Sequence, residues 1–257
     1  MITARIPGFF RALFLTILSA AVFAPVQAKE INMAIGFSLG PYAVSNGRGM
    51  LVDITREAIE AAGHTVNFTF MTNKESIKAF EQGVFDAVAM TRAAEDKFYY
   101  SEPVITIENV AITLKSANIT INSLADLGKY EVMAFSGART FLGPEFAAAV
   151  SNNPRYIEVA NQQTQVHMLY DKRAQVMIAG KTIFSYYLKK LQLRQSIAPD
   201  SSAQYQFAEI FPPTVYVSGF KSKADRDEFN RGLAIIKKDG RYDRIQNTYA
   251  HLIKRLN

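Results

Sequence analysis

The chain has 257 residues, no cysteine and a formal net charge of +6 at neutral pH. The absence of cysteine excludes a disulfide framework and a lipidated cysteine anchor. The lysines and arginines are scattered and form no stripe with aromatic residues, so the sequence does not point to nucleic-acid binding. Apolar residues make up 49% of the chain, which is enough for one large or two small packed cores.

The first 28 residues have the pattern of a secretory signal peptide. Arg5 and Arg11 precede the apolar run "ALFLTILSAAVFA", and "VQA" has small residues at the positions that a signal peptidase reads. The run is shorter than the about 20 apolar residues of a membrane-spanning helix. We therefore expect cleavage after Ala28 and a free periplasmic protein of 257 − 28 = 229 residues, whose net charge falls to +4 without the two arginines.

The next part of the chain alternates between strand-like and helix-like segments. Apolar runs predict strands, and apolar residues at helical spacing, stopped by Gly63 and Gly83, predict helices. The first unit has strands at 31–37, 64–70 and 84–90 and helices at 50–63 and 74–83. Such alternation favours parallel strands in a sheet that helices cover on both faces.

The same pattern restarts after residue 110. The second unit has an extended stretch at 110–121, a turn or short helix at 123–128, strands at 130–135, 155–160 and 174–179, and helices at 143–150, 163–172 and 181–191. A last strand-like run at 211–220 precedes helices at 224–240 and 241–256. Two helices are too few for a third domain, so we expect them to pack on the first unit.

These segments predict an α/β fold of two lobes with a cleft between them. One lobe is expected from residues 29–112 and 217–257, and the other from residues 113–216. Extended crossings near 110–115 and 214–220 should join the lobes and act as hinges.

Polar and charged residues follow the carboxyl ends of the predicted strands, where ligands bind in open parallel sheets. We expect them to line the cleft: Tyr42, Thr91, Arg92, Ser136, Gly137, Arg139, Thr140, Gly180 and Lys181. Arg92 has no acidic neighbour before Glu95, which favours a contact with a ligand anion over a solvated surface position. Loop packing is the alternative for Tyr42, and a solvated helix start is the alternative for Lys181. Arg139 is electrostatically ill-placed, because a helix N-terminus already favours anions.

Motifs for catalysis and metal binding are weak. Ser136 lies in "FSG", which lacks the nucleophile-elbow pattern. His64, His167 and His251 are dispersed without the spacing of metal ligands. We therefore expect no catalytic residue, no metal and no cofactor.

Five segments, in order, resemble the family 3 periplasmic solute-binding proteins, the receptors of polar amino acid ABC transporters. They are "GRGMLVDITREAIEAAG", "SIKAFEQGVFDAVAM", "FYYSEPV", "SLADLGKYEVMAFSG" and "KKDGRYDRIQNTYAHL". The resemblance covers nearly the whole mature chain. It implies the periplasmic-binding-protein fold, in which two α/β lobes joined by two hinge strands close over a ligand. It also implies a small-molecule ligand and a membrane permease as partners, and we expect a monomer.

Only some of the family's ligand-binding residues have a match in this chain. Tyr42, in "GPYAVSNG", matches the aromatic wall of the family's pocket. The family's arginine, which grips the ligand carboxylate, would fall on Ala94 in this shorter loop. Arg92 is the only arginine of the loop, so we expect it to be the substitute.

The second half of the site departs further from the family. "GART" places Arg139 where a hydroxyl usually meets the carboxylate. The family's acids, which pair with the ligand ammonium, are replaced by Gln175 and Gly180, and Lys181 follows. Charge-assisted hydrogen bonds contribute roughly 1.5–3 kcal/mol each. Charge matching therefore predicts a small polar, anionic solute, either amino-acid-like or a carboxylate.

Two other functions are compatible with this fold. A sensor module that signals to a membrane kinase would use the same closure. A periplasmic dehydratase-like enzyme would need a carboxylic acid aimed into the cleft. The four loops after the strands supply no Asp or Glu, so we expect a binding protein rather than an enzyme.

Overall fold

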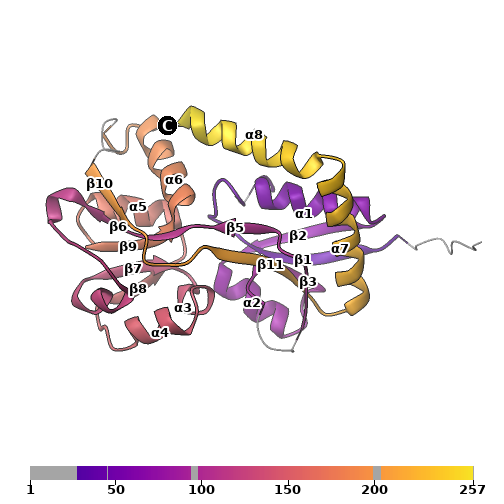
Figure 1. Ribbon diagram of the computed structural model, residues 1–257, viewed down its shortest axis with the longest axis horizontal. Coiled ribbons are helices and arrows are strands. Elements are labelled where there is room, and N and C mark those ends of the chain that lie inside the picture. The colour runs from indigo at the N-terminus through magenta and orange to yellow at the C-terminus, as the bar shows by residue number, and fades with distance from the viewer. Residues whose placement is uncertain (1–27, 45, 94–97, 199–203, 257) are drawn as a thin grey trace, which may run out of the picture.

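The computed structural model describes residues 28–44, 46–93, 98–198 and 204–256, with 252–256 described by their backbone. The predicted signal peptide up to residue 27 lies outside these ranges. Two sheets, each flanked by helices, follow one another along the long axis of the molecule (Figure 1). None of the described helices is both long and apolar enough to cross a membrane.

The first sheet has the strand order β2-β1-β3-β11-β4, and β5 also pairs with β11. Its strands are β1 Glu30–Gly36, β2 Thr65–Met71, β3 Ala87–Thr91, β4 Tyr99–Tyr100, β5 Ile105–Ile107 and β11 Thr214–Phe220. The strands β1, β2 and β3 are parallel, whereas β11 is antiparallel to its neighbours. The helices that pack on this sheet are α1 Met50–Ala61, α2 Asn73–Glu81 and α7 Lys223–Lys238. We call this unit lobe I.

The second sheet has the order β10-β6-β9-β7-β8. Its strands are β6 Asn109–Leu114, β7 Val132–Phe135, β8 Tyr156–Val159, β9 Val176–Gly180 and β10 Tyr205–Ala208. Its helices are α3 Ala138–Phe141, α4 Pro144–Ser151, α5 Gln162–Tyr170 and α6 Lys181–Leu193, with 3₁₀ turns at Lys115–Ala117 and Leu124–Lys129. Every residue of β6, β7 and β9 is buried, as their continuous apolar runs predict. We call this unit lobe II.

The predicted elements of the α/β pattern are all present, but the prediction of one long extended segment is wrong. The stretch 110–121 is not continuous, because β6 ends at Leu114 and a 3₁₀ turn follows. Asn118 ends this turn in the left-handed conformation, at φ 52°, which asparagine tolerates better than most residues. Four short elements were not predicted: β4, β5, β10 and α3.

The chain crosses from lobe I to lobe II after β5 and returns to lobe I before β11. The segments 110–115 and 214–220, which the sequence analysis took as crossings, lie almost wholly within β6 and β11. The strands change from the first sheet to the second between Ile107 and Asn109, and they change back between Ala208 and Thr214. The division therefore comes slightly before the expected boundaries at 112/113 and 216/217.

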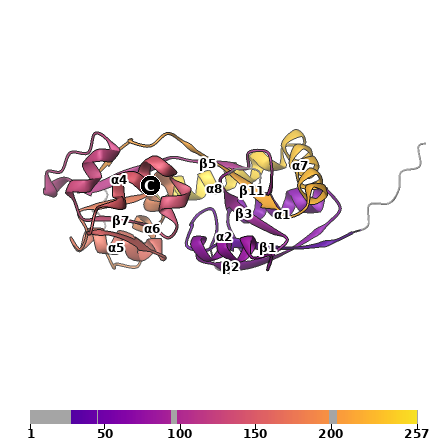
Figure 2. The same cartoon turned by 90° about the horizontal axis from the view of Figure 1, so that it is seen from below.

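The two C-terminal helices do not both stay on lobe I. Helix α7 packs on α1, as expected. Helix α8, Arg241–Leu256, contacts α1 and α7 and also contacts α6 of lobe II. It runs from the end of α7 across to α6 and is seen again between the lobes in the perpendicular view (Figures 1 and 2). Helix α8 is therefore a further link between the lobes.

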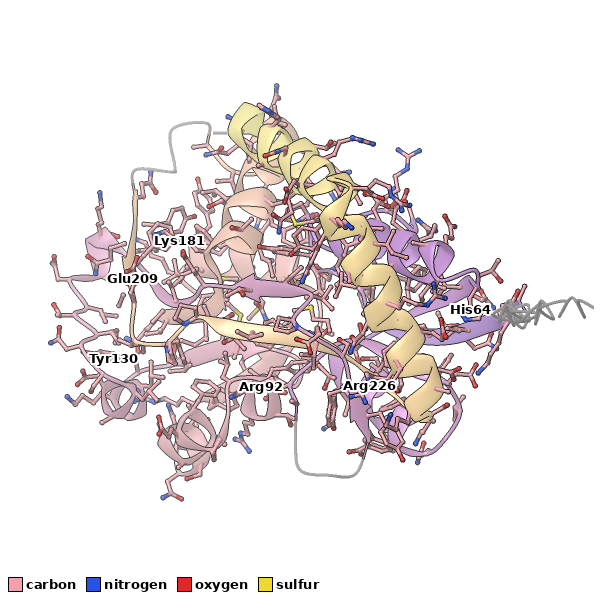
Figure 3. The ribbon with its side chains drawn as sticks, turned by 45° about the vertical axis from the view of Figure 1, so that its right-hand side comes forward. His64, Arg92, Tyr130, Lys181, Glu209 and Arg226 are labelled. Carbon is pink, nitrogen blue, oxygen red and sulfur yellow. The ribbon has the colours of Figure 1, made fainter. Side chains whose placement is uncertain are left out.

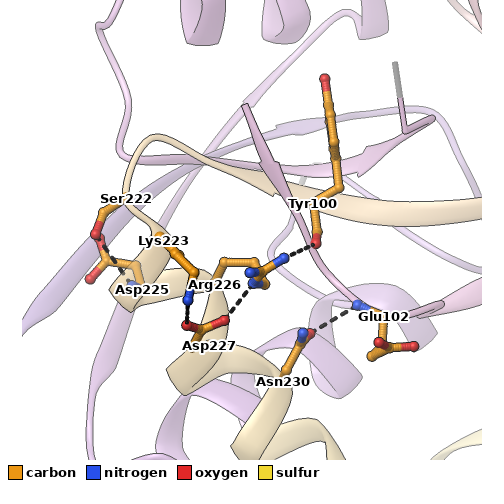
Figure 4. Close-up of polar contacts among 8 residues, drawn as sticks. All are labelled: Tyr100, Glu102, Ser222, Lys223, Asp225, Arg226, Asp227 and Asn230. Atoms are coloured by element: carbon orange, nitrogen blue, oxygen red, sulfur yellow. Dashed lines mark hydrogen bonds and ion pairs between the residues drawn. The ribbon is translucent and has the colours of Figure 1, made fainter. Parts of the chain in front are cut away.

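The start of α7 is fastened to the segment that leads to the first crossing (Figure 4). Arg226 Nη1 donates to the carbonyl of Tyr100 over 3.1 Å, and Asn230 Oδ1 accepts from the backbone N–H of Glu102 over 2.9 Å. Asp227 holds the guanidinium of Arg226 at 2.7 Å. These contacts keep the segment between β4 and β5 in place while it leaves the sheet.

Gly232 provides a test of the packing between α7 and α1. A Cβ added to Gly232 would overlap the carbonyl oxygen of Ala58. Overpacking costs typically about 1–3 kcal/mol, so Gly232→Ala should lower the free energy of unfolding by about that amount in urea denaturation. Gly128→Ala is the control, because its Cβ would meet no atom within 4 Å. Equal stability of the two variants would contradict this packing.

Candidate functional site

The loop after β1 joins lobe I to lobe II directly. Ser38 Oγ accepts a hydrogen bond from the backbone N–H of Gln162 over 2.9 Å, at the start of α5. The N–H of Gly40 donates to the hydroxyl of Tyr187, on α6, over 3.1 Å. Ser38 has a left-handed backbone, at φ 62°, which is uncommon outside glycine. This strained loop is therefore held by contacts with the other lobe.

Tyr42 lies in the same contact between the lobes. Its side chain is buried, at 7% exposure, and its hydroxyl forms a hydrogen bond with the side chain of Thr182 at the start of α6. Burial raises the pKa of Tyr42, and the hydrogen bond with Thr182 opposes that shift. In this arrangement Tyr42 packs between the lobes, and its contact with a ligand remains a prediction.

Arg92 crosses from lobe I to lobe II, between the two sheets (Figure 3). Its Nη1 donates to the carbonyl of Phe141 over 3.2 Å. Phe141 is the last residue of α3, where cations are favoured because the last carbonyls carry negative partial charge. Gly143 leaves room for the guanidinium, since an added Cβ would lie 2.6 Å from Nη1. Arg92 thus has a protein partner in lobe II, and its grip on a ligand anion remains a prediction.

Thr91 and Arg92 both border an apolar pocket of about 280 Å³ between α2 and α3. Most of its other walls are rings and aliphatic carbons of the two lobes, and Glu81 of α2 adds an acid: Ile77, Phe80, Glu81, Phe98, Tyr100, Phe141 and Pro144. Thr140 also lines this pocket. The pocket beside Arg92 therefore combines apolar rings with one acid, Glu81, which the sequence analysis did not expect there.

A polar pocket of about 380 Å³ lies beside it and shares Thr140. Lys74 of α2 lines it from lobe I, and the other walls come from lobe II: Gly137, Arg139, Thr140, Tyr156 and Glu158. Three of the predicted site residues therefore meet here with a lysine that was not predicted. The pocket contains both signs of charge.

Glu158 is the residue that the sequence analysis missed. Its carboxylate accepts hydrogen bonds from the N–H of Gly137 at 2.7 Å and of Arg139 at 3.3 Å, and from the hydroxyl of Tyr156 at 2.9 Å. The backbone donors offered to a ligand are thus engaged within the protein. One acid therefore lines the pocket, although the sequence analysis expected none. It comes from the end of a strand and not from one of the four loops.

Neighbouring strands explain how Glu158 reaches this position. Strands β7 and β8 are parallel, and Glu158 stands opposite Ala134 in the register. The carboxyl end of β8 therefore lies beside the turn that follows β7. A lone acid in the predicted strand "RYIEVA" was the available signal.

The side chain of Arg139 contacts Tyr156, which is also a hydrogen-bond partner of Glu158. Its guanidinium carbon lies 4.7 Å from the centroid of the Tyr156 ring, which is cation–π distance. Burial and the adjacent Glu158 carboxylate raise the pKa of Tyr156 well above its usual value. Tyr156 therefore stays a neutral donor to Glu158 at physiological pH.

Besides Tyr42, three predicted residues lie outside the walls of these two pockets. Lys181 Nζ donates to Glu209 Oε1 over 3.1 Å and lies 5.8 Å from the Phe207 ring centroid, so it is drawn to its own lobe (Figure 3). This agrees with the alternative of a solvated helix start. Gly180 is the buried last residue of β9, and Ser136 is half-buried just before the turn at Gly137.

A hydrogen bond joins the two segments that connect the lobes. Asn109 Nδ2 donates to Thr214 Oγ1 over 3.1 Å, so a residue of β6 meets a residue of β11. Tyr216 is buried beside them, and burial raises its pKa to about 12. No cluster of three or more acidic or histidine side chains suited to a metal occurs among the described residues.

Comparison with known proteins identifies the family. The sequence profile of the bacterial extracellular solute-binding proteins, family 3, matches residues 24–251. The chain belongs to this family. No curated protein sequence matches it. The family and the two-lobed fold predicted from the sequence are thereby confirmed.

Solved structures with the same fold have low sequence identity to this family member. An ancestral arginine-binding protein bound to arginine shares 21% identity, with a TM-score of 0.71 over 86% of this chain and 97% of that chain. A histidine kinase sensor domain similar to periplasmic binding proteins shares 18%, with a TM-score of 0.72 over 86% and 95%. A substrate-binding protein of an ABC uptake transporter from Streptococcus pneumoniae, with bound histidine, shares 16%, with a TM-score of 0.68 over 86% and 92%.

The hydrogen bonds of Glu158 can be tested by substitution. Glu158→Ala leaves the two backbone N–H groups and the Tyr156 hydroxyl without this acceptor, which costs about 1–3 kcal/mol for each group left buried and unsatisfied. Because the site is only part-buried, we expect a loss of about 1–3 kcal/mol in total, measured by urea denaturation. Glu131→Ala, at an exposed acid beside β7, should change stability by less than about 0.5 kcal/mol. A Glu158→Ala protein as stable as the wild type would refute the role of this carboxylate.

Proposed function

We propose that this family member captures a small polar solute in the cleft between its lobes, in the periplasm, and presents it to the membrane permease of an ABC transporter. The observation that carries this proposal is the polar pocket beside Thr140, which has walls from both lobes. A solute there touches both lobes and favours the arrangement in which they are together. We propose that the protein acts in this way without catalysis.

The charges of the pocket suggest the class of solute. Lys74 and Arg139 face one acid, Glu158, so the described walls carry an excess positive charge. A solute carboxylate would be attracted by that excess. Glu158 offers an acceptor to a solute ammonium as well, so the presence of this acid extends the predicted anionic solute to amino acids. We therefore propose an amino-acid-like or other carboxylate solute, with a net negative charge preferred.

The similar structures support a role in uptake. One is the substrate-binding protein of an amino acid ABC transporter, at 18% identity and a TM-score of 0.65. Identities this low show the fold alone, so the transport partner is part of the proposal. The resemblance to a histidine kinase sensor domain keeps sensing as the second candidate. Stimulation of a permease's ATPase by the loaded protein would favour uptake over sensing.

Binding is tested first by identifying what the protein carries. Mass spectrometry of protein purified from the periplasm under native conditions should detect a small polar solute, which calorimetry then confirms against a panel of dicarboxylates, keto acids and amino acids. Arg139→Gln should weaken binding about tenfold or more, because a charge-assisted hydrogen bond contributes roughly 1.5–3 kcal/mol. Lys181→Gln should change the affinity less than about twofold, because Lys181 pairs with Glu209.

Three outcomes would overturn parts of this proposal. If no member of the panel binds and nothing is carried, the solute-binding role fails. If Arg139→Gln and Lys181→Gln lose affinity equally, the polar pocket is not the site. Turnover of a bound prephenate-like substrate would show an enzyme instead.

A further inference from the structure

A third cavity lies between α6, α8 and the described residues of the loop after β1, 41–44 and 46–49. Its volume is about 720 Å³, within the 300–1,000 Å³ typical of small-molecule sites. It shares no wall residue with the two cleft pockets. We call it the back pocket, and its described walls are Pro41, Val44, Asn46, Arg48, Gly49, Tyr186, Thr248, Tyr249 and His251.

The lobe I side of the back pocket is firmly built. The Tyr249 hydroxyl of α8 donates to Asp53 Oδ2 over 2.6 Å and accepts from the N–H of Gly49 over 3.1 Å. Gly49 has φ 140°, and a Cβ at this position would overlap the carbonyl of Tyr42, so only glycine fits. The tyrosine thus fixes α8 against the loop and keeps the cavity open.

The lobe II side of the back pocket is the ring of Tyr186. This ring packs on Gly40, where an added Cβ would overlap the ring carbons. Burial raises the pKa of Tyr186, so its hydroxyl is neutral at physiological pH. A molecule in the back pocket would therefore contact both lobes and α8 at once.

The charge in the back pocket is positive. Arg48 is exposed, and its side chain forms no ion pair with a described residue. None of the described wall residues is an acid. The carboxylate of Asp53 accepts the hydrogen bond of the Tyr249 hydroxyl and also pairs with Arg56 at 3.5 Å. The walls of the cavity thus include a cation, two aromatic rings and the carbons of Pro41 and Val44.

We propose that the back pocket is a second ligand site, which takes a small aromatic anion such as an aromatic carboxylate or sulfonate. The rings of Tyr186 and Tyr249 hold the flat apolar body, and Arg48 pairs with the anionic group. Because its walls come from both lobes, the ligand stabilises the arrangement in which the lobes meet. The back pocket shares no wall residue with the two cleft pockets, so its ligand would not touch the solute in the cleft.

The test uses 8-anilinonaphthalene-1-sulfonate, an aromatic sulfonate whose fluorescence rises in apolar sites. The folded protein should bind one molecule saturably. Arg48→Gln should weaken binding at least fivefold. Thr248→Phe on α8, and separately Asn46→Trp on the loop after β1, should abolish it by filling the cavity from exposed wall positions.

Two matched controls separate this site from general surface charge and from the cleft. Arg244→Gln removes an exposed arginine of α8 that is not a wall residue, and Arg139→Gln removes the cleft arginine. Both should change the affinity for the sulfonate less than twofold. The proposal is overturned if the wild type shows no saturable binding, if both filling variants bind normally, or if either control loses as much affinity as Arg48→Gln.

Discussion

The guanidinium of Arg92 leaves the end of β3 and donates a hydrogen bond to the carbonyl of Phe141 in the opposite lobe. This contact determines how the cleft is divided. The apolar pocket of about 280 Å³ lies on one side of Arg92, and a cavity of about 340 Å³ beside Pro212 and Pro213 lies on the other. Beside this contact, Lys74 of α2 and Arg139 of α3 line the same polar pocket. The cleft that we describe therefore depends on the lobes being joined at this point.

Several polar groups of the cleft already have partners within the protein. Arg92 has a carbonyl partner, and Glu158 takes the N–H groups of the turn at Gly137. A solute that uses the same groups must replace these bonds, and the exchange of one hydrogen bond for another yields little net free energy. The excess charge of Lys74 and Arg139 is then the main source of selectivity. Affinity would come from contacts that exist only when the lobes enclose the solute.

The fold was largely predictable from the sequence because its determinants are local. Continuous apolar runs predicted the buried strands of lobe II, and helical spacing ended by Gly63 predicted α1. The break after Leu114 was missed because "ITLKSANITI" alternates like a strand, while the left-handed Asn118 turns the chain. Strands of two or three residues, such as β4 and β5, are too short to show a period.

The site was less predictable because its partners come from distant segments. Gly137, Arg139 and Thr140, which the carboxyl-end rule assigned to the cleft, line one pocket with Lys74 of the other lobe, and their contact with a ligand stays a prediction. This rule could not show that Lys181 would pair with Glu209, 28 positions along the chain. Nor could it show that Glu158 would reach the turn after β7, since that depends on the order of strands in the sheet.

The joining of the lobes by Arg92 can be measured directly, because the chain has no cysteine and accepts two spin labels cleanly. Lys78→Cys on α2 and Ala148→Cys on α4 are exposed positions on opposite lobes. Pulsed electron–electron double resonance should give one narrow distribution of distances between the two spin labels. Adding Arg92→Gln should shift the distribution to longer and broader distances, which a bound solute shortens again. An identical narrow distribution with and without Arg92 would contradict the account.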